Sequence, residues 1–414
     1  MKRLLLSATA LAVSLLFAVP AQADWEMLRE QNATYTFHIT QDGTMLLSDF
    51  LWEMNGGIYI SEDHGATWKK TGAKDYNYSN FYEFGDYIYA IGYGCHIARS
   101  EDGGHTWDIL YYGRALEEAN LPHATPDNLE GSQVQAMALY NDKLFVADCN
   151  YGVLMSDDWG ETWTITDYKS LSYEVDDGGK GKGDGTAIDF LYNLVVYNCK
   201  LMATALYRCY EYLPATNKWK VIRNDSNVTA VWTILDGTLY VGRSIFNMST
   251  EIPFLMKTTD LKTWKNTGRP SNTVDTNVRA LYSDKDCLYA GLQNGGLYFS
   301  FDGGATWNCY NEGLPHRYEN GKLTEEYQHL LRIISDDEYV YVAMYNEPWN
   351  ESEHSSGVYR IARSELDAFR PEHINQTTNA VLSNNVDCYD LTGRRINASQ
   401  PGVSIVGGKK VILK

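Results

Sequence analysis

Ser61-Glu-Asp63-His-Gly65-Ala-Thr67-Trp68 is the first of four complete copies of the pattern S-x-D-x-G-x-T-W in this chain. The other complete copies occupy residues 100–107, 156–163 and 300–307, and residues 259–264 hold a degenerate fifth copy without the glycine. A pattern that recurs in this way indicates a repeat architecture, in which each copy marks the same place in one structural unit.

The residue types of the motif are typical of a tight turn that leads into a strand. A short carboxylate such as Asp63 accepts hydrogen bonds from backbone amides within a turn, and Gly65 allows a positive φ. Thr67 and Trp68 then begin a strand, because β-branched and aromatic side chains suit a pleated sheet. Carboxylates repeated in every unit cannot all belong to one active site, so we interpret them as structural. They are Asp63, Asp102, Asp158, Asp260 and Asp302.

These repeats resemble the Asp-box (BNR) repeats found in sialidases, sortilin-type receptors, some endoglucanases and photosystem assembly factors. In that family each box is the hairpin turn between the third and fourth strands of a propeller blade. The resemblance implies an all-β fold, a β-propeller of the sialidase/sortilin-like superfamily, with the boxes on a structural face of the ring.

Tryptophans that open the fourth strands give the number of blades. Such a tryptophan ends each box, and Trp219 opens an equivalent strand without a box. A seventh blade follows Trp307 but has no tryptophan-led fourth strand. Residues 24–32 carry the missing pattern, so we expect this segment to become the outer strand of the last blade, with Trp25 buried beside residues 358–361. The pattern predicts seven blades, and a ring of six or eight is the alternative.

The first residues have the pattern of a secretory signal. Lys2 and Arg3 precede an apolar run, which is followed by Ala21-Gln22-Ala23, a small-x-small cleavage site. The run is short for a membrane span, and no second long apolar run follows. We expect a signal peptide at 1–23, a propeller at 24–371 and a β-rich tail at 372–414, in a protein that is secreted or displayed at the cell surface after passing through the periplasm. A retained signal anchor is the alternative.

The tail contains two stretches, 386–395 with Tyr-Asp-Leu-Thr-Gly-Arg and 402–414 with Lys409-Lys410 near its end. They resemble the short C-terminal segment of secreted Bacteroidetes proteins, which in fuller form is a type IX sorting signal. A plain terminal hairpin that packs on the propeller is the other interpretation.

The composition limits the partners. The formal net charge is −18, so nucleic acid and anionic membranes are repelled, whereas neutral glycans, peptides and cations are compatible. The seven cysteines show no zinc-site spacing, and Cys95 and Cys149 are the best disulfide candidates because they occupy equivalent loops of adjacent blades. Residues 176–184 are rich in glycine and aspartate but do not match an EF-hand, and we interpret them as a loop. We therefore expect no metal and no cofactor.

Loops from the second to the third strand, and from the fourth strand to the next blade, share the face opposite the boxes. Their aromatic and charged residues predict a platform for a sugar or a peptide. The ligand-binding candidates are Trp52, Tyr93, His96, Asp148, Tyr151, Tyr207, Arg208, Arg243, Arg317, Glu347 and Trp349.

The sequence favours a binding scaffold for an extracellular glycan or protein, because this function requires no missing motif. A glycoside hydrolase on the same face is the alternative. A sialidase needs three arginines around a carboxylate, for which Arg208, Arg243 and Arg317 are available, but the usual Arg-Ile-Pro motif is absent. A two-carboxylate glycosidase needs a facing acid pair, such as Asp148 and Glu347.

Overall fold

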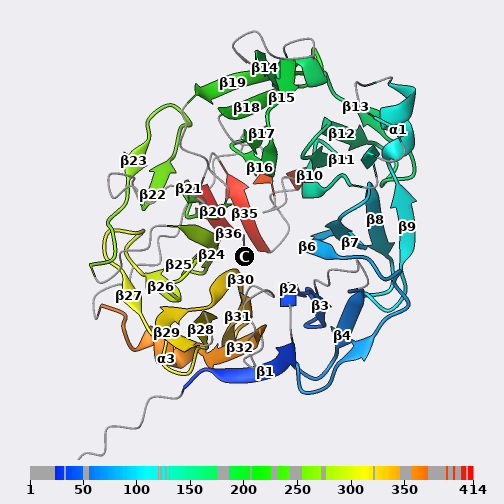
Figure 1. Cartoon of the computed structure of the whole chain (residues 1–414). Helices are drawn as coiled ribbons and strands as arrows, with labels where there is room; N and C mark the ends of the chain where they lie inside the picture. Colours follow the sequence, from blue (N-terminus) through cyan, green and yellow to red (C-terminus); the bar gives the residue numbers. More distant parts are fainter. Residues whose placement is uncertain are drawn as a thin grey trace, which may run out of the picture.

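The computed structural model describes residues 24–31, 34–49, 56–119, 131–174, 186–205, 208–224, 231–242, 254–271, 277–319, 322–345 and 356–371, with short stretches at 121, 124–125, 128–129 and between 388 and 413. Seven four-stranded antiparallel sheets stand around a central axis (Figure 1).

Each blade has one inner strand at the central axis and three further strands that follow outward. Blade 1 is β2 (Thr34–Ile39), β3 (Met45–Asp49), β4 (Ile58–Ser61) and β5 (Lys69–Lys70). Blade 2 is β6 (Tyr78–Phe84), β7 (Tyr87–Gly92), β8 (His96–Ser100) and β9 (Asp108–Tyr111). Blade 3 is β10 (Val134–Tyr140), β11 (Lys143–Asp148), β12 (Gly152–Ser156) and β13 (Thr164–Ile165). Blade 4 is β16 (Leu191–Tyr197), β17 (Lys200–Ala205), β18 (Arg208–Leu213) and β19 (Lys218–Asn224). Blade 5 is β20 (Val231–Leu235), β21 (Thr238–Gly242), β22 (Leu255–Thr258) and β23 (Lys265–Asn266). Blade 6 is β24 (Val278–Asp284), β25 (Cys287–Leu292), β26 (Leu297–Ser300) and β27 (Asn308–Cys309). Blade 7 is β30 (His329–Ser335), β31 (Tyr339–Tyr345), β32 (Ser356–Ala362) and β1 (Glu26–Gln31).

Inner strands of neighbouring blades contact one another all the way round, in the order β2, β6, β10, β16, β20, β24, β30 and back to β2. The predicted seven-bladed β-propeller is therefore confirmed.

The connections carry further short elements. They are α1 (Gly113–Glu118), η1 (Tyr168–Leu171), the pair β14 (Ser172–Glu174) and β15 (Thr186–Ile188), the pair β28 (His316–Glu319) and β29 (Lys322–Tyr327), and α3 (Arg363–Asp367). In the tail, β33 (Cys388–Tyr389), β34 (Arg395–Ile396), β35 (Gly402–Val406) and β36 (Lys409–Leu413) form a separate sheet in the order β34-β33-β35-β36.

The hydrophobic core is divided into wedges between adjacent blades. The described core residues fall into seven clusters, and each cluster joins the facing sides of two neighbouring sheets. Both faces of every blade are therefore covered by a neighbour. This explains why second strands such as β3 and β25 are buried at every position instead of alternating.

The N-terminal strand closes the ring. β1 pairs antiparallel with β32, with Glu26 opposite Arg360 and Gln31 opposite Ser356. Trp25, which precedes β1, is 5% exposed and packs in the wedge between blades 6 and 7 beside Tyr359. Its indole Nε1 donates a hydrogen bond to the Tyr310 carbonyl oxygen at 2.9 Å. Blade 7 thus combines strands from the two ends of the propeller, and β1 covers the edge that β32 would otherwise expose.

The box turn is fastened by its own side chains. In the first box, Asp63 Oδ1 accepts hydrogen bonds from the Thr67 backbone amide and the Ser61 hydroxyl, each at 2.8 Å. Asp63 Oδ2 accepts from the Thr67 hydroxyl at 2.5 Å, and the Gly65 amide donates to Ser61 Oγ at 3.0 Å. The second, third and fourth boxes repeat this arrangement. The carboxylates therefore act as structural acceptors within the turns.

The box glycine also touches the preceding blade. Gly104 and Gly160 both have φ of +98°, which a residue with a side chain rarely adopts. A Cβ on Gly104 would lie 2.6 Å from Leu46 Cδ2 of blade 1, and a Cβ on Gly160 would lie 2.7 Å from Leu110 Cδ1 of blade 2. Glycine is therefore required both for the turn and for the close approach of two blades.

Hydrogen bonds tie three of the boxes to the preceding blade. In each case the backbone carbonyl of the fourth motif residue accepts from a basic side chain on the third strand of that blade. The pairs are Arg99 with Trp159 at 3.1 Å, Lys257 with Gly303 at 2.8 Å and Arg360 with His64 at 3.4 Å. A charged donor strengthens such a bond, so the boxes stabilise the joints between blades as well as the hairpins.

Truncation of Trp25 tests the closure. We expect Trp25→Ala to lower the free energy of unfolding by about 3–5 kcal/mol, because a large buried side chain leaves a cavity. Trp25→Phe keeps an aromatic side chain in the wedge, so it should lower the free energy of unfolding by less. The lost indole hydrogen bond should contribute about 1 kcal/mol of that decrease. Chemical denaturation of the two variants measures both effects. Equal and small losses would contradict a closing role for this residue.

Acid titration tests the box carboxylates. Although burial raises the pKa of Asp102, the hydrogen bonds from Thr106 and Ser100 outweigh it and lower the pKa to about 2. Since this pKa is lower in the folded than in the unfolded chain, the stabilisation is present above about pH 4 and is lost as the pH falls toward the folded value. Asp102→Asn, which cannot accept from Thr106 with its amide nitrogen, should cost about 1 kcal/mol at pH 7. Denaturation curves should show the gap to the wild type closing below pH 4, and a gap independent of pH would contradict this account.

Candidate functional site

A β-bulge begins the inner strand of most blades. In every blade except blade 5, the register between the first and second strands shifts by one residue near the start of the first strand. In blade 2, for example, Tyr78 faces Gly92 and Asn80 faces Ile91, which leaves Ser79 as the extra residue. A bulge changes the direction of its side chain and is common beside binding sites.

The bulged residues line the central channel. A cavity of about 240 Å³ lies among the inner strands, and the bulge residues Ser79, Gln135, Tyr192, Arg279 and Leu331 all contribute to its wall. A second cavity of about 170 Å³ adjoins it and shares part of that wall. The bulges therefore build the site by turning side chains of the inner strands toward the axis.

The charge of these cavities is opposite to that of the whole protein. Two guanidinium groups, Arg279 and Arg332, line both cavities, together with amides such as Asn80 and Asn193. No carboxylate is among the described residues that line either cavity. The chain as a whole has a net charge of −18, whereas the described residues that line these cavities include two arginines and no carboxylate.

Arg332 connects three blades. Its Nε donates to Thr36 Oγ1 of blade 1 at 3.2 Å, and its Nη2 donates to the Ser79 carbonyl oxygen of blade 2 at 2.9 Å. Nearby, burial lowers the pKa of His329 to about 4, and the positive charges of Arg279 and Arg317 add to this effect. His329 is therefore neutral at pH 7, and the positive charge in this region comes from arginine side chains.

Sequence reasoning missed both channel arginines because they lie within apolar strands instead of loops. Arg279 stands in Val278–Asp284 and Arg332 in His329–Ser335. An arginine flanked by apolar residues within an inner strand is the signal that was available. Its orientation depends on the bulge, which arises from pairing with the next strand and leaves no mark in the local pattern.

Five of the predicted ligand-binding candidates, Trp52, Tyr207, Arg243, Glu347 and Trp349, lie outside the described residues. Tyr93 and Arg208 are half-buried, the first in a bridge with Gln133 and the second at the start of β18. Arg317 lies in the hairpin β28–β29, where its Nη1 is 3.4 Å from Glu326 Oε2. His96 is packed between two aromatic rings, with centroid distances of 4.8 Å to Tyr76 and 5.1 Å to Tyr111.

Two further candidates are buried, which corrects the prediction that they face a ligand. Asp148 is 0% exposed and Tyr151 is 5% exposed. Asp148 Oδ2 accepts from the Tyr112 hydroxyl at 2.7 Å and from the Ser132 hydroxyl at 2.6 Å, while Oδ1 accepts from the amides of Asn150 and Tyr151 at 2.8 and 3.1 Å. Asp148 therefore holds the turn between β11 and β12 against the connection before blade 3, and it is not available as a glycosidase carboxylate.

The expected disulfide between Cys95 and Cys149 is also incorrect, since both residues are free thiols in the structure. Cys95 Sγ donates to the Leu129 carbonyl oxygen at 3.4 Å. Burial raises the pKa of each thiol to about 12, so neither is a reactive thiolate at neutral pH.

Within the part of the chain that the structure describes, no group of three or more His, Cys, Asp or Glu residues is arranged to hold a metal ion. In the same residues, no helix is long and apolar enough to cross a membrane.

Comparison with known proteins supports the fold. No family model matches the chain, and no curated protein matches its sequence. Among solved structures, the chain is similar to the extracellular domain of a Bacteroides protein, from B. thetaiotaomicron, described as a hybrid two-component system, at 13% identity and a TM-score of 0.52 over 81% of this chain and 39% of that chain. It is also similar to YCF48 from Cyanidioschyzon merolae, at 16% identity and a TM-score of 0.51 over 83% of this chain and 99% of that chain. A structure of YCF48 bound to D1 peptide matches at 15% identity and a TM-score of 0.52, over 82% of this chain and 96% of that chain.

This chain spans about two fifths of the Bacteroides structure. At these identities the likeness concerns the fold alone. The class that the fold and the comparisons define is a seven-bladed β-propeller with propeller-type neighbours.

Replacement of Asp148 distinguishes a structural role from a ligand-binding one. We expect Asp148→Ala to lower the free energy of unfolding by about 3 kcal/mol or more, because several buried donors lose their acceptor. Asp157→Ala, an exposed change in the same blade, should cost less than about 0.5 kcal/mol. Chemical denaturation of both variants provides the measurement, and a wild-type stability for Asp148→Ala would reject the structural assignment.

Proposed function

We propose that the chain is a secreted Asp-box β-propeller that acts as a binding scaffold for an extracellular glycan or protein partner, and that its central channel anchors an acidic group of that partner. The observation that carries this proposal is the cavity lined by bulge residues, with Arg279 and Arg332 in its wall and no carboxylate among its described lining residues.

The chemistry of the cavity favours a carboxylate or a similar anion. A guanidinium group binds carboxylate oxygens through charge-assisted hydrogen bonds, and amides such as Gln133 and Asn193 supply further donors. Elsewhere the excess of acidic residues disfavours anions, so an acidic ligand is directed to the channel. A glycan with uronic or sialic acid units and the C-terminal carboxylate of a polypeptide both have this chemistry.

Other observations support the finer assignments within the proposal. The side-chain hydrogen bonds of Asp63 and its equivalents support membership of the repeats in the Asp-box family. The propeller neighbours are compatible with a scaffold role: one is an extracellular domain of a sensor system, and another was determined with a bound peptide. Residues 1–23, which lie outside the described residues, support secretion by their sequence pattern alone. The tail sheet is proposed as a sorting segment on the same basis.

Binding measured with acidic and neutral probes tests the proposal. We expect residues 24–414 to bind acidic oligosaccharides, such as tetragalacturonate or sialyllactose, or peptides with a free C-terminal carboxylate, on an array and in titration calorimetry. Arg279→Gln should weaken this binding at least tenfold. Arg269→Gln, which makes the same charge change at an exposed site outside the channel, should leave it unchanged.

Hydrolysis of the glycans is followed in parallel. Absence of binding by every acidic probe, or equal binding by Arg279→Gln and the wild type, contradicts the channel assignment. Release of sugar products would support the glycoside hydrolase alternative instead. The described channel residues offer no carboxylate pair for that chemistry.

A further inference from the structure

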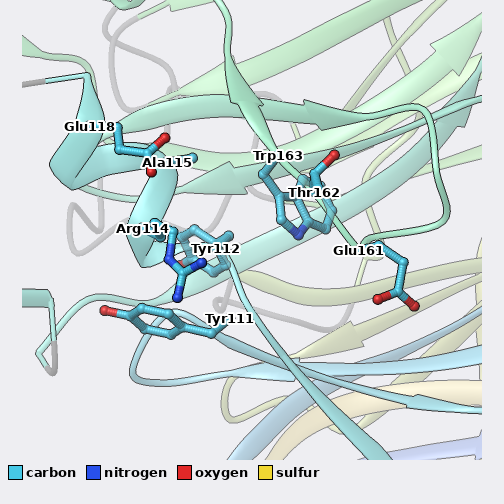
Figure 2. Close-up of a pocket in the computed structure, with 8 residues that line it drawn as sticks. All are labelled: Tyr111, Tyr112, Arg114, Ala115, Glu118, Glu161, Thr162 and Trp163. Atoms are coloured by element: carbon cyan, nitrogen blue, oxygen red, sulfur yellow. The ribbon is translucent and has the colours of Figure 1, made fainter.

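A third cavity lies at the outer part of the ring, between blades 2 and 3 (Figure 2). Its volume is about 420 Å³, which falls within the usual range of roughly 300–1,000 Å³ for small-ligand sites. The wall comes from three places: the end of β9, the short helix α1 and the box of blade 3. Because α1 belongs to the long connection between blades 2 and 3, this cavity belongs to the joint between those two blades. It shares no described lining residue with the channel cavities.

Tyr111 offers an exposed aromatic ring to this cavity. The residue is 43% exposed, which makes it one of the few large hydrophobic residues at the surface among those that the structure describes. The ring is held in place from two sides. His96 packs against it with a centroid distance of 5.1 Å, and a Cβ on Gly113 would lie only 2.2 Å from the Tyr111 hydroxyl oxygen. The absence of a side chain at Gly113 therefore makes room for the phenol, and the ring is a prepared platform.

Trp163 differs from the other box tryptophans. Its Nε1 is buried and has no hydrogen-bond partner among the residues that the structure describes. The equivalent indoles of the other complete boxes all donate to backbone carbonyl oxygens, Trp68 to Gly65 at 3.0 Å, Trp107 to Gly104 at 2.8 Å and Trp307 to Gly268 at 3.0 Å. Buried donors are satisfied in most native structures, so this exception needs a physical reason. In Figure 2 the nitrogen lies at the lower edge of the ring, between the sides on which Tyr111 and Glu161 are drawn.

The charged groups around the cavity have mixed signs. Arg114 and Glu118 come from α1, and Glu161 comes from the box. Glu161 Oε1 also accepts a hydrogen bond from Arg99 Nη2 at 2.7 Å, which fixes its position. The guanidinium group supplies hydrogen-bond donors and the carboxylates supply acceptors. An anion would be repelled by the carboxylates, and a cation would be repelled by the guanidinium group. A neutral molecule that carries many hydroxyl groups is matched by all of them.

We propose that this cavity binds a pyranose unit of a neutral glycan. The apolar face of the sugar stacks on Tyr111, hydroxyl groups exchange hydrogen bonds with Arg114 and Glu118, and a sugar oxygen accepts the hydrogen bond that the Trp163 indole offers. Aromatic stacking provides the apolar contact area, and the polar groups select the orientation of the sugar.

Matched tryptophan variants provide the test. Trp163→Phe removes a donor that has no protein partner among the described residues, whereas Trp107→Phe removes a donor that is bonded to Gly104. We expect Trp107→Phe to lower the melting temperature by a few degrees and to leave sugar binding unchanged. We expect Trp163→Phe to keep the melting temperature and to weaken sugar binding. This opposite pattern separates a ligand-binding indole from a structural one.

Saturation-transfer NMR and calorimetry on residues 24–414 measure the binding of cellotetraose, xylotetraose, mannotetraose and laminaritetraose. At least one of these neutral sugars should bind, and both Tyr111→Ala and Trp163→Phe should weaken it by roughly fivefold. The indole resonance of Trp163, assigned from its loss in Trp163→Phe, should shift during the titration.

Three results would overturn the proposal: no binding by any of the four sugars, equal binding by Tyr111→Ala and the wild type, or binding that is lost in Arg279→Gln but kept in Tyr111→Ala. The last result would place the sugar in the channel. Because these four probes are neutral and the channel test uses acidic ones, failure of one proposal leaves the other intact.

Discussion

The structure depends on the burial of both faces of every sheet by the two neighbouring sheets. A single blade with two apolar faces cannot be stable in water, and a row of blades would leave an apolar face at each end. Closing the ring removes both ends at once, which explains why the first strand of the propeller is used to complete the last blade. The box turns act at the same joints, since their glycines allow close approach and their carbonyl groups accept hydrogen bonds from the adjacent blade. Hairpin stability and ring stability are therefore supported by one motif.

The sequence predicted those parts of the fold that are encoded locally. The boxes carry their own hydrogen-bond donors and acceptors, and the pattern around Trp25 resembles a fourth strand, so the number of blades and the closing strand were accessible. Features that depend on pairing between distant segments were not. Arg279 and Arg332 face the channel because of bulges set by the register of neighbouring strands, and Asp148 is buried by a connection that begins many residues earlier. For the same reason the equivalent positions of Cys95 and Cys149 did not imply a bond between them.

The polar groups of the propeller are arranged in two chemically different regions. The described wall of the channel holds arginines and amides, whereas the outer cavity between blades 2 and 3 combines an aromatic ring with charges of both signs. Tyr112 belongs to both surroundings, because it lines the outer cavity and donates its hydroxyl hydrogen to Asp148, which shapes the turn between β11 and β12.

The hydrogen bond from the preceding blade to the fourth motif residue uses a backbone carbonyl, and this has an evolutionary consequence. A backbone acceptor does not depend on residue identity, and the position is occupied by His64, Trp159 and Gly303 in the three joints concerned. The side chain at this position is consequently free to diversify without loss of the joint. The joint therefore constrains the glycine, the apolar residues of the wedge and the basic donor, but not the identity of the fourth motif residue.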